Sequence, residues 1–340
     1  MVSIYDNDAI EQLRARYAVQ PHRMKLFRNA FFKKALEVDE VLAVLPDGAQ
    51  AAFRGEVEFQ SLELVERHDS KIDGASKLVF RTADGLLLES VILRPQTGRT
   101  SLCISSQVGC ACGCNFCATG QMGFVRNLTT AEILDQVVLA ARLAKAEGRG
   151  IRNVVFMGMG EPLLNTDHLF QALESLQAAP LFNYAGSRLM VSTVGIPHEM
   201  EHFSRRFPEV RLALSLHSAR QEVREKLMPL AQKYSLERLR KSLVAISTNG
   251  KVMVEYLLLA GLNDRPEDFQ ALESYLRGLP VHINLIPFNP FSGCELRGTP
   301  KPEREAFVAQ LKQAGFNTTL RYSFGADIAA ACGQLVRKFI

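Results

Sequence analysis

Hydrophobic positions follow a helical spacing over roughly the first 50 residues of the chain. The clearest series is Met24, Phe27, Ala30 and Phe31. Steps of three and four residues place these side chains on one face of a helix, so we expect them in a core. The turn-forming run Leu-Pro-Asp-Gly at 45–48 is expected to close this helical unit.

The polar positions of the same segment are rich in basic residues, namely Arg23, Lys25, Arg28, Lys33 and Lys34. A basic helix face is either simply solvated or a surface that contacts the phosphates of a nucleic acid. The pattern leaves both interpretations open.

Between residues 56 and 98 the hydrophobic spacing shortens to runs that are typical of strands. These runs lie at 61–66, 76–80 and 86–93, and Asp-Gly pairs separate them. The spacing predicts a small antiparallel hairpin or meander. We therefore expect three units: an N-terminal helical accessory domain at 1–55, a β-hairpin extension at 56–98 and a main domain at 99–340.

In the main domain, strand-like and helix-like patterns alternate without a long linker. Strands are expected at 102–105, 153–157, 188–193, 210–217, 251–259, 281–287 and 317–323. Helices are expected between them, at 129–147, 166–177, 235–247, 266–277 and 302–314 among others, with a final helix after the last strand. This alternation predicts an α/β fold whose parallel sheet is open or curled toward a barrel.

Cysteines are concentrated immediately after the first of these strands. Five of the seven cysteines lie within residues 103–117, and Cys110, Cys114 and Cys117 have a C-x3-C-x2-C spacing. Soft sulfur ligands favour zinc, Cu(I) or an iron-sulfur cluster. Three ligands would leave one iron of a cubane open to a small molecule. The alternative is a structural zinc loop that uses Cys112 as its fourth ligand.

Small and polar residues follow the other expected strands. They are Gly160 and Glu161, Ser192, Ser215 with Leu216 and His217, and Asn289. The carboxyl ends of parallel strands meet at one edge of a sheet, so these residues are expected around one mouth. There Glu161 is suited to bind the ammonium of an amino acid. Each residue also has an ordinary structural interpretation, as a tight turn, a core histidine or a helix cap.

Composition limits the classes of protein that these patterns allow. The 340 residues are 47% hydrophobic and 22% charged, which is ordinary for a soluble globular protein. No apolar run has transmembrane length and the N-terminus lacks signal-peptide features, so we expect a cytoplasmic protein without a membrane partner. The net charge of +4 permits an RNA partner without requiring one.

Several motifs in sequence order carry a specific resemblance. They are Cys103-Ile-Ser-Ser-Gln-Val-Gly-Cys110, Cys117-Ala-Thr-Gly, Arg126-Asn-Leu-Thr129, Phe156-Met-Gly-Met-Gly-Glu-Pro162, Ser215-Leu-His217, Asn284-Leu-Ile-Pro and Asp327-Ile-Ala-Ala-Ala-Cys332-Gly-Gln-Leu335. With these motifs the chain resembles the RlmN/Cfr family of radical S-adenosylmethionine (SAM) RNA adenine methyltransferases. The likeness runs from about residue 88 to residue 335, and the N-terminal 85 residues match only loosely.

The resemblance implies a partial (β/α)6 barrel of the TIM type, preceded by a small helical domain that helps to hold RNA. It implies a [4Fe-4S] cluster on Cys110, Cys114 and Cys117, and two SAM molecules per turnover. It also implies an electron donor such as flavodoxin or ferredoxin. The family's SAM contacts correspond here to Gly160, Glu161, Ser192, Ser215, Leu216, His217 and Asn289.

The resemblance also assigns roles to three residues outside the cluster. Cys332 takes a methyl group from one SAM by displacement, and a radical made from a second SAM then activates that methyl group for addition to adenine. Cys103 resolves the resulting protein–RNA adduct by forming a transient disulfide with Cys332, and Glu89 is the proton acceptor. Cys112 has no counterpart among these roles, and we interpret it as inert.

The family contains two regiochemistries, and the sequence favours one of them. The expected activity is methylation of an adenosine of 23S rRNA at C2, with tRNA as a further substrate in some relatives. The alternative is methylation at C8, as in the Cfr branch. A hypothesis from a different class is a zinc-stabilised RNA-binding module without catalysis.

Overall fold

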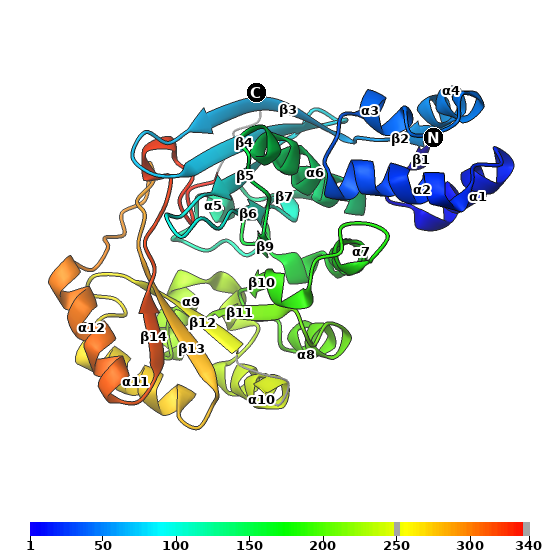
Figure 1. The fold of residues 1–340 in the computed structure, drawn as a ribbon. Coiled ribbons are helices and arrows are strands. Elements are labelled where there is room, and N and C mark those ends of the chain that lie inside the picture. Colours follow the sequence, from blue (N-terminus) through cyan, green and yellow to red (C-terminus); the bar gives the residue numbers. More distant parts are fainter. Residues whose placement is uncertain (248–251, 336–340) are drawn as a thin grey trace.

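The computed structural model describes residues 1–247 and 252–335, and its central feature is one curved sheet (Figure 1). The strands of this sheet are β3 (Leu62–Asp69), β4 (Ala75–Thr82), β5 (Leu87–Leu93), β6 (Ser101–Ile104), β9 (Asn153–Phe156), β10 (Leu189–Thr193), β11 (Arg211–Ser215), β12 (Val252–Leu258), β13 (Val281–Pro287) and β14 (Asn317–Leu320). Across the described residues their order is β14-β13-β12-β11-β10-β9-β6-β5-β4-β3.

The strands from β6 through β14 in this order are parallel to one another. The helices that connect them are α6 (Thr130–Ala146), α7 (Thr166–Gln177), α8 (Pro197–Arg206), α9 (Gln221–Leu227), α10 (Leu236–Ser247), α11 (Pro266–Leu276) and α12 (Lys301–Gln313). They lie on the outer side of the sheet (Figure 1). Within the described residues β14 does not pair with β3, so the barrel is partial. The predicted fold class is confirmed.

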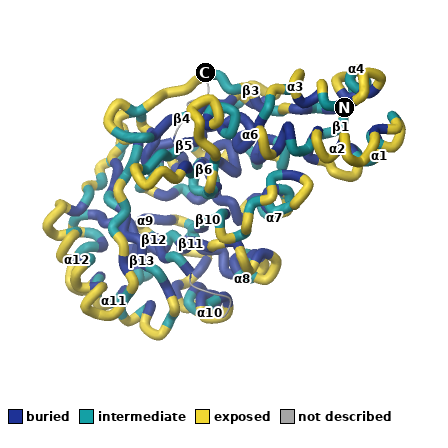
Figure 2. Tube along the Cα trace, viewed as in Figure 1, coloured by how far each residue is buried: buried dark blue, intermediate teal, exposed yellow. Residues whose placement is uncertain are grey.

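The strands of the parallel part are covered on both faces. Leu212, Ala213 and Leu214 are consecutive on β11, and all three are buried. Successive strand residues point to opposite faces, so a continuous buried run requires packing on both sides. Figure 2 shows this buried interior along the sheet, while exposed positions follow the outer helices.

The predicted β extension is part of the same sheet. Strands β3, β4 and β5 are antiparallel, and β5 continues the ladder onto β6 through the pair Val91 and Cys103. The turn between β3 and β4 also contacts the C-terminal loop. Ser70 Oγ donates to Asp327 Oδ1 at 2.8 Å, and the Gly325 amide donates to Asp73 Oδ2 at 2.8 Å. The extension therefore supports the loop that carries Cys332.

The N-terminal segment consists of short helices beside α6. They are α1 (Asn7–Arg16), α2 (Pro21–Arg28), a π-helical turn (Asn29–Lys33), α3 (Val38–Leu42) and α4 (Asp47–Glu56), flanked by the paired strands β1 (Val2–Ser3) and β2 (Val57–Glu58). The apolar face predicted around Phe27 is buried, as expected. The prediction that the run at 45–48 closes the helical unit is wrong. Pro46 instead caps α4, with Asp47 in its first turn, because both residue types suit a helix start.

Asp135 on α6 joins the N-terminal helices to the rest of the molecule. Tyr5 Oη donates to Asp135 Oδ1 at 2.5 Å. The amides of Ser61 and Leu62 donate to Asp135 Oδ2 at 2.5 and 2.9 Å. Burial raises the pKa of the Asp135 carboxyl to about 6, although these hydrogen bonds oppose the rise. One carboxyl group thus connects the accessory helices, the extension and the barrel.

The C-terminal segment departs from the predicted strand and helix. Strand β14 ends at Leu320, and Ala326–Ile328 form a single 3₁₀ turn followed by a loop through residue 335. Gly325 and Ala329 flank the turn at positive φ values of 73° and 50°, which a right-handed helix cannot include. The predicted final helix is absent through residue 335, and residues 336–340 lie outside the described part of the chain.

Among the helices of the described residues, none combines the length and the apolar character that crossing a membrane requires.

Candidate active site

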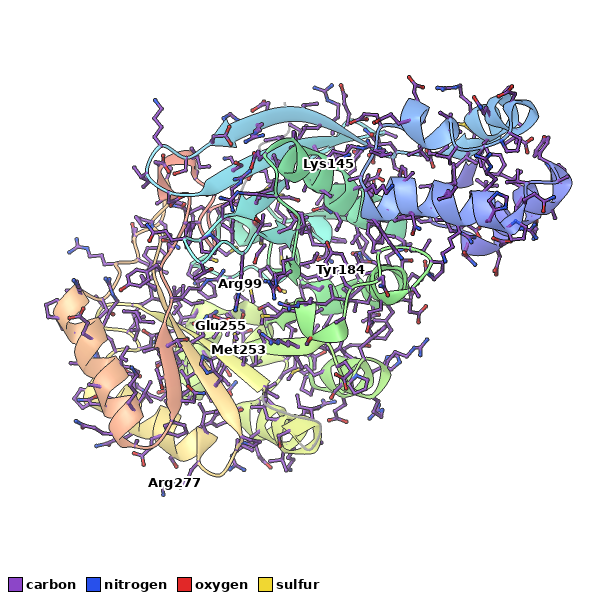
Figure 3. The ribbon with its side chains drawn as sticks, viewed as in Figure 1. Arg99, Lys145, Tyr184, Met253, Glu255 and Arg277 are labelled. Atoms are coloured by element: carbon purple, nitrogen blue, oxygen red, sulfur yellow. The ribbon has the colours of Figure 1, made fainter. Side chains whose placement is uncertain are left out.

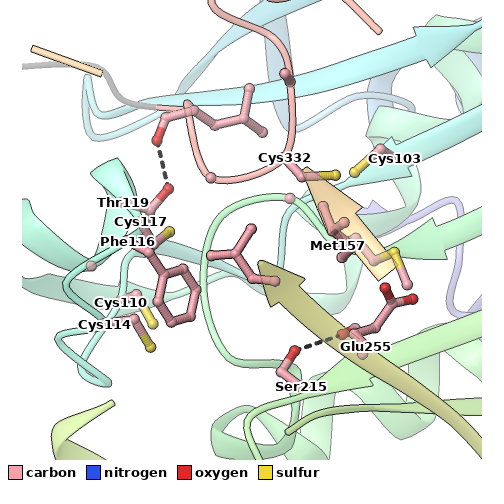
Figure 4. Close-up of a pocket in the computed structure, with 18 of the residues that line it drawn as sticks. Cys103, Cys110, Cys114, Phe116, Cys117, Thr119, Met157, Ser215, Glu255 and Cys332 are labelled. Carbon is pink, nitrogen blue, oxygen red and sulfur yellow. Dashed lines mark hydrogen bonds between the residues drawn. The ribbon is translucent and has the colours of Figure 1, made fainter. Parts of the chain in front are cut away.

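One pocket lies at the carboxyl ends of the parallel strands and brings together cysteines from distant parts of the chain (Figure 4). Cys110, Cys114 and Cys117 line it, as do Cys103 from the end of β6 and Cys332 from the C-terminal loop. The site residues Gly160, Glu161, Ser192, Ser215 and His217 also line this pocket. The expectation of a common mouth at the strand ends thus agrees with the fold.

The cysteine loop is held in shape by tight backbone packing. It leaves the hairpin of β7 (Gln107–Gly109) and β8 (Phe124–Asn127), and it ends in the short helix α5 (Ala118–Gln121). A Cβ atom on Gly120 would lie 2.8 Å from the amide nitrogen of Cys114, so only glycine fits there. The Phe116 ring packs edge-on against His217, with 4.7 Å between ring centroids.

The three cysteines of the motif fit an iron-sulfur cluster. Burial raises the pKa of the Cys114 thiol, and the neighbouring Cys117 and Cys110 thiolates raise it further. Thiolates gathered in this way need a cationic partner. Among the described residues, no three Cys, His, Asp or Glu side chains lie close enough to hold a single metal ion. A cubane is larger than one ion and accommodates more widely spaced thiolates, so the donor set favours the cluster over the zinc loop.

Cys112, which has no role in the resemblance, lies inside the cysteine loop. It is only 1% exposed, and it lines the same pocket. A hydrogen bond between the two thiols lowers the pKa of Cys110. The residue therefore lies directly beside one of the cluster cysteines.

The Glu161 side chain, in the loop after β9, is held by backbone amides of its own loop and of the loop after β10. Gly160 has a φ of 97°, and a Cβ atom there would lie 2.5 Å from the Gln107 Cβ. The Glu161 carboxylate accepts from the amides of Leu163 at 3.0 Å and Val194 at 2.8 Å. Burial raises the pKa of this carboxyl to about 7. A buried and oriented carboxylate of this kind suits the ammonium group of an amino acid.

Ser192, Ser215 and His217 lie on the neighbouring strand ends. The two hydroxyl oxygens are 3.4 Å apart. His217 has a φ of 55°, and its Nδ1 accepts from the Leu257 amide at 3.1 Å. Burial and the nearby Arg224 lower the pKa of His217 to about 3, so the imidazole is neutral and carries its proton on Nε2.

Three predicted site residues lie outside the wall of the pocket. Leu216 is fully buried, and its carbonyl accepts from Arg224 Nε at 3.2 Å. Asn289 Nδ2 donates to the Cys332 carbonyl at 3.1 Å, so it holds the C-terminal loop. Glu89 lies on the same face of β5 as Val91, and its carboxylate is 3.3 Å from Lys77 Nζ. Their assigned roles stay predictions.

Cys103 and Cys332 lie on the side of the pocket opposite the cluster cysteines, with their sulfur atoms directed toward each other (Figure 4). Burial raises the pKa of Cys103 to about 12, and a charge on Cys332 contributes to the rise. Negative charges on Cys332 and Cys103 raise the pKa of Arg321, so its guanidinium group lies close to both cysteines. Both cysteines are free thiols in the structure.

The C-terminal loop is fastened directly to the cysteine loop. The Ala118 amide donates to the Gly333 carbonyl at 2.7 Å. Thr119 Oγ1 donates to the Leu335 carbonyl at 2.5 Å. Both bonds hold residues directly after Cys332, so the position of that cysteine depends on the segment that follows Cys117.

Two charged residues of the pocket were missed from the sequence. Glu255 lies within β12 and Arg321 follows β14, and both line the pocket. The signal available in advance was a lone carboxylate inside the apolar strand that runs from Val252 to Leu258. A charge in a strand buried on both faces requires a partner or a ligand.

A model of the radical SAM superfamily matches residues 104–272 of the chain. A probable RNA methyltransferase of Rhodopirellula baltica is 46% identical over 340 residues, which cover 99% of this chain and 88% of that protein. The chain belongs to the RlmN/Cfr family of radical SAM RNA methyltransferases.

A further relative and a solved structure show the same similarity. A probable dual-specificity RNA methyltransferase RlmN of Thermus thermophilus is 41% identical over 296 residues, covering 86% of this chain and 83% of that protein. The crystal structure of a radical SAM methyltransferase from Sphaerobacter thermophilus superposes with a TM-score of 0.93 at 35% identity, covering 98% of this chain and 99% of that one. As a family member the chain is an enzyme whose cofactors are a [4Fe-4S] cluster and SAM.

Proposed function

We propose that this chain methylates an adenosine of 23S rRNA at C2, with tRNA as a second substrate, and that Cys332 carries the methyl group. The observation that carries the proposal is the meeting of Cys103 and Cys332 in one pocket with the three cluster cysteines. A radical SAM enzyme acting on an unrelated substrate has no need of that facing pair of thiols. The relatives named RlmN favour C2 over the alternative C8 position.

The adenine C2 position explains why the pocket needs more than a nucleophile. It is an aromatic C–H carbon with little nucleophilic character, so simple displacement on a methyl donor fails there. When bound, the cluster and SAM supply the radical chemistry that this position requires. All other steps fall to side chains of the chain itself.

Glu161 holds the SAM ammonium, and Gly160 allows the backbone to approach it. Ser192, Ser215 and His217 complete the SAM contacts, with Leu216 and Asn289 supporting the adjacent backbone. Cys110, Cys114 and Cys117 bind the cluster. These SAM contacts and cluster ligands leave the side of the pocket near Cys103 for the RNA base.

Cys332 accepts the methyl group as a thiolate nucleophile, and Arg321 supplies the nearby positive charge. Cys103 keeps its proton until the adduct forms, because burial holds its pKa near 12. It then forms a disulfide with Cys332 as the methylated adenine leaves. The sulfur–carbon bond of the adduct breaks in this step, and the Cys103 proton goes to the leaving carbon to complete the methyl group. Glu89 accepts the proton that adenine C2 loses, and Lys77 at 3.3 Å stabilises the charge of Glu89.

The proposed partners follow from this chemistry. An electron donor such as flavodoxin or ferredoxin reduces the cluster. The N-terminal helices contribute to RNA binding, and the reaction takes place in the cytoplasm, where 23S rRNA and tRNA are found.

The regiochemistry is tested by nucleoside mass spectrometry on 23S rRNA and tRNA from cells with and without the protein. The expected product is 2-methyladenosine that disappears when the gene is deleted. Finding 8-methyladenosine alone would overturn the C2 assignment, and finding neither product would overturn the proposed function.

A further inference from the structure

A row of polar side chains crosses the interior of the barrel at one register. Ser215 on β11 is paired with Glu255 on β12, Glu255 with Asn284 on β13, and Asn284 with Thr319 on β14. Thr319 Oγ1 donates to Asn284 Oδ1 at 3.0 Å, and Asn284 Nδ2 donates to Glu255 Oε2 at 2.8 Å. The hydrogen bonds therefore run in one direction and end on the Glu255 carboxyl group.

One oxygen of that carboxyl group has no partner. Glu255 is 2% exposed, and its Oε1 is buried without a hydrogen bond among the described residues. Leaving a buried acceptor unsatisfied costs about 1–3 kcal/mol, and more when the group is charged. Figure 3 places Glu255 in the middle of the barrel, far from the peripheral Arg277. Because the residue lines the pocket, a bound molecule can provide the missing donor.

The position of Glu255 within the pocket narrows the choice of that molecule. In Figure 4, Glu255, Met157, Cys103 and Cys332 lie on one side, and the cluster cysteines lie on the other. Arg321 also belongs to this side of the pocket, because its Nη1 contacts Met157 Sδ at 3.7 Å. The base that takes the methyl group from Cys332 would approach this side of the pocket, where Ser215, which is assigned to SAM, is also the paired neighbour of Glu255.

We propose that Glu255 Oε1 accepts a hydrogen bond from the 6-amino group of the target adenine in RNA. This inference rests on the proposed function. Adenine carries a donor at position 6, whereas guanine and hypoxanthine carry an acceptor there. A carboxylate that only accepts therefore admits adenine and repels a 6-oxo purine. Nothing in the SAM or cluster assignments uses this residue.

Opposing influences act on the ionisation of Glu255, and burial is the largest of them. Burial raises the pKa of Glu255, while the positive charge of Arg321 and the hydrogen bond from Asn284 oppose the rise. No ion pair within 4.0 Å joins Arg321 to Glu255 in the described part of the chain, although the charge of Arg321 acts on Glu255. Oε1 is therefore left to the ligand.

The hydrogen-bond row makes Glu255→Gln an unusually informative variant. Asn284 keeps its amide nitrogen toward position 255, because its oxygen already accepts from Thr319. The new glutamine must direct its oxygen toward Asn284 and its NH2 group toward the pocket. The substitution thus replaces an acceptor with a donor at almost constant shape, which preserves the fold.

The experiment uses the full-length, cluster-loaded enzyme and a synthetic RNA hairpin that contains the mapped target adenosine. Three hairpins carry adenosine, purine riboside or inosine at that position, and methyl transfer is measured as kcat/KM. We expect the natural enzyme to prefer adenosine to purine riboside by about 10- to 100-fold, the value of one charged hydrogen bond. It should accept inosine least of the three.

Glu255→Gln is expected to lose activity on adenosine and gain on inosine, so that the inosine-to-adenosine ratio rises at least about 10-fold. SAM affinity should stay the same. Glu237→Gln, which changes an exposed residue of α10, is the matched control and should leave all three rates unchanged.

An unchanged ratio in Glu255→Gln would overturn the inference, because it would mean that Glu255 presents a donor or does not meet the base. A loss of SAM affinity with an unchanged ratio would overturn it as well, by assigning Glu255 to the SAM adenine. Absence of methyl transfer to adenosine by the natural enzyme would instead contradict the proposed function.

Discussion

The N-terminal helices and the barrel pocket treat their charged side chains in opposite ways. Among the helices, Arg28 Nη2 binds Glu11 at 2.7 Å and Asn7 at 2.8 Å. In the pocket, Glu255 keeps one oxygen without a partner although it is almost fully buried. A charge satisfied within the protein serves architecture, whereas an unsatisfied charge in the wall of a pocket is open to a ligand.

This contrast also changes how the basic helix face is interpreted. Arg28 Nη2 is held by its two partners, and Lys33 Nζ donates to the Ala179 carbonyl at 2.9 Å, so both side chains also have a structural role. Arg23 and Lys25 remain exposed. The following predictions test which side chains stabilise the fold and which ones bind a ligand, beginning with the largest expected effect.

Replacing Cys332 with Ala should reduce RNA methylation at least about 1,000-fold, because the methyl carrier is lost. Iron, sulfide and SAM binding should be unchanged, since Cys332 lies apart from the cluster cysteines. These quantities are measured on anaerobically purified protein. The matched control is Cys294→Ala, which changes a cysteine outside the pocket wall and should remain active. A fully active Cys332→Ala enzyme would contradict the proposed mechanism.

Replacing Cys103 with Ala should stop the cycle one step later. The adduct between Cys332 and RNA would form and persist, because its resolving thiol is missing. Gel electrophoresis should show a slower protein band that nuclease treatment removes. Normal turnover without such a band would exclude Cys103 from catalysis.

Reversing charge at Arg23 and Lys25 together should weaken RNA binding by about 10-fold at low salt and less at high salt, because released counterions drive phosphate contacts. Affinity is measured by filter binding across a salt series. Lys241→Glu on α10 is the control, since its exposed ion pair lies on the outer face of the barrel. Equal affinities would mean that the accessory face is only solvated.

Replacing Asp135 with Asn should mainly change how the free energy of unfolding depends on pH. The folded pKa near 6 exceeds the ordinary value of 3.8, so the contribution of Asp135 is present at low pH and is lost as pH rises through 6. Relative to the variant, the natural protein should lose about 1 kcal/mol between pH 5 and 7.5 in urea unfolding. A difference that is independent of pH would contradict the assignment.

The sequence predicted the barrel because its signals are periodic and extend over many residues. It failed at 45–48 and after Leu320, where short local signals had to be interpreted alone. A proline followed by Asp-Gly suits a turn, and it suits the start of α4 equally well. The Ala-rich run near Cys332 suits a helix, but Gly325 and Ala329 adopt left-handed conformations that prevent it.

The site was predictable to the extent that its chemistry is local. Cysteine spacing identifies the cluster loop within a few residues, and the strand-end rule brings Glu161 to the same mouth. The position of Glu255 depends on strand register and on which face of β12 points inward, and neither is encoded nearby. Asn289 was expected at SAM, but its amide contacts the Cys332 carbonyl across more than forty residues of chain.

The two hydrogen bonds from α5 to the C-terminal loop have a consequence for the position of Cys332. Ala118 and Thr119 follow Cys117 directly and hold the segment around Cys332. By linkage, whatever stabilises the cysteine loop also stabilises the placement of Cys332. The cysteine loop and the C-terminal loop therefore behave as one unit. A substitution that loosens α5 is expected to displace Cys332 without changing any residue of the C-terminal loop.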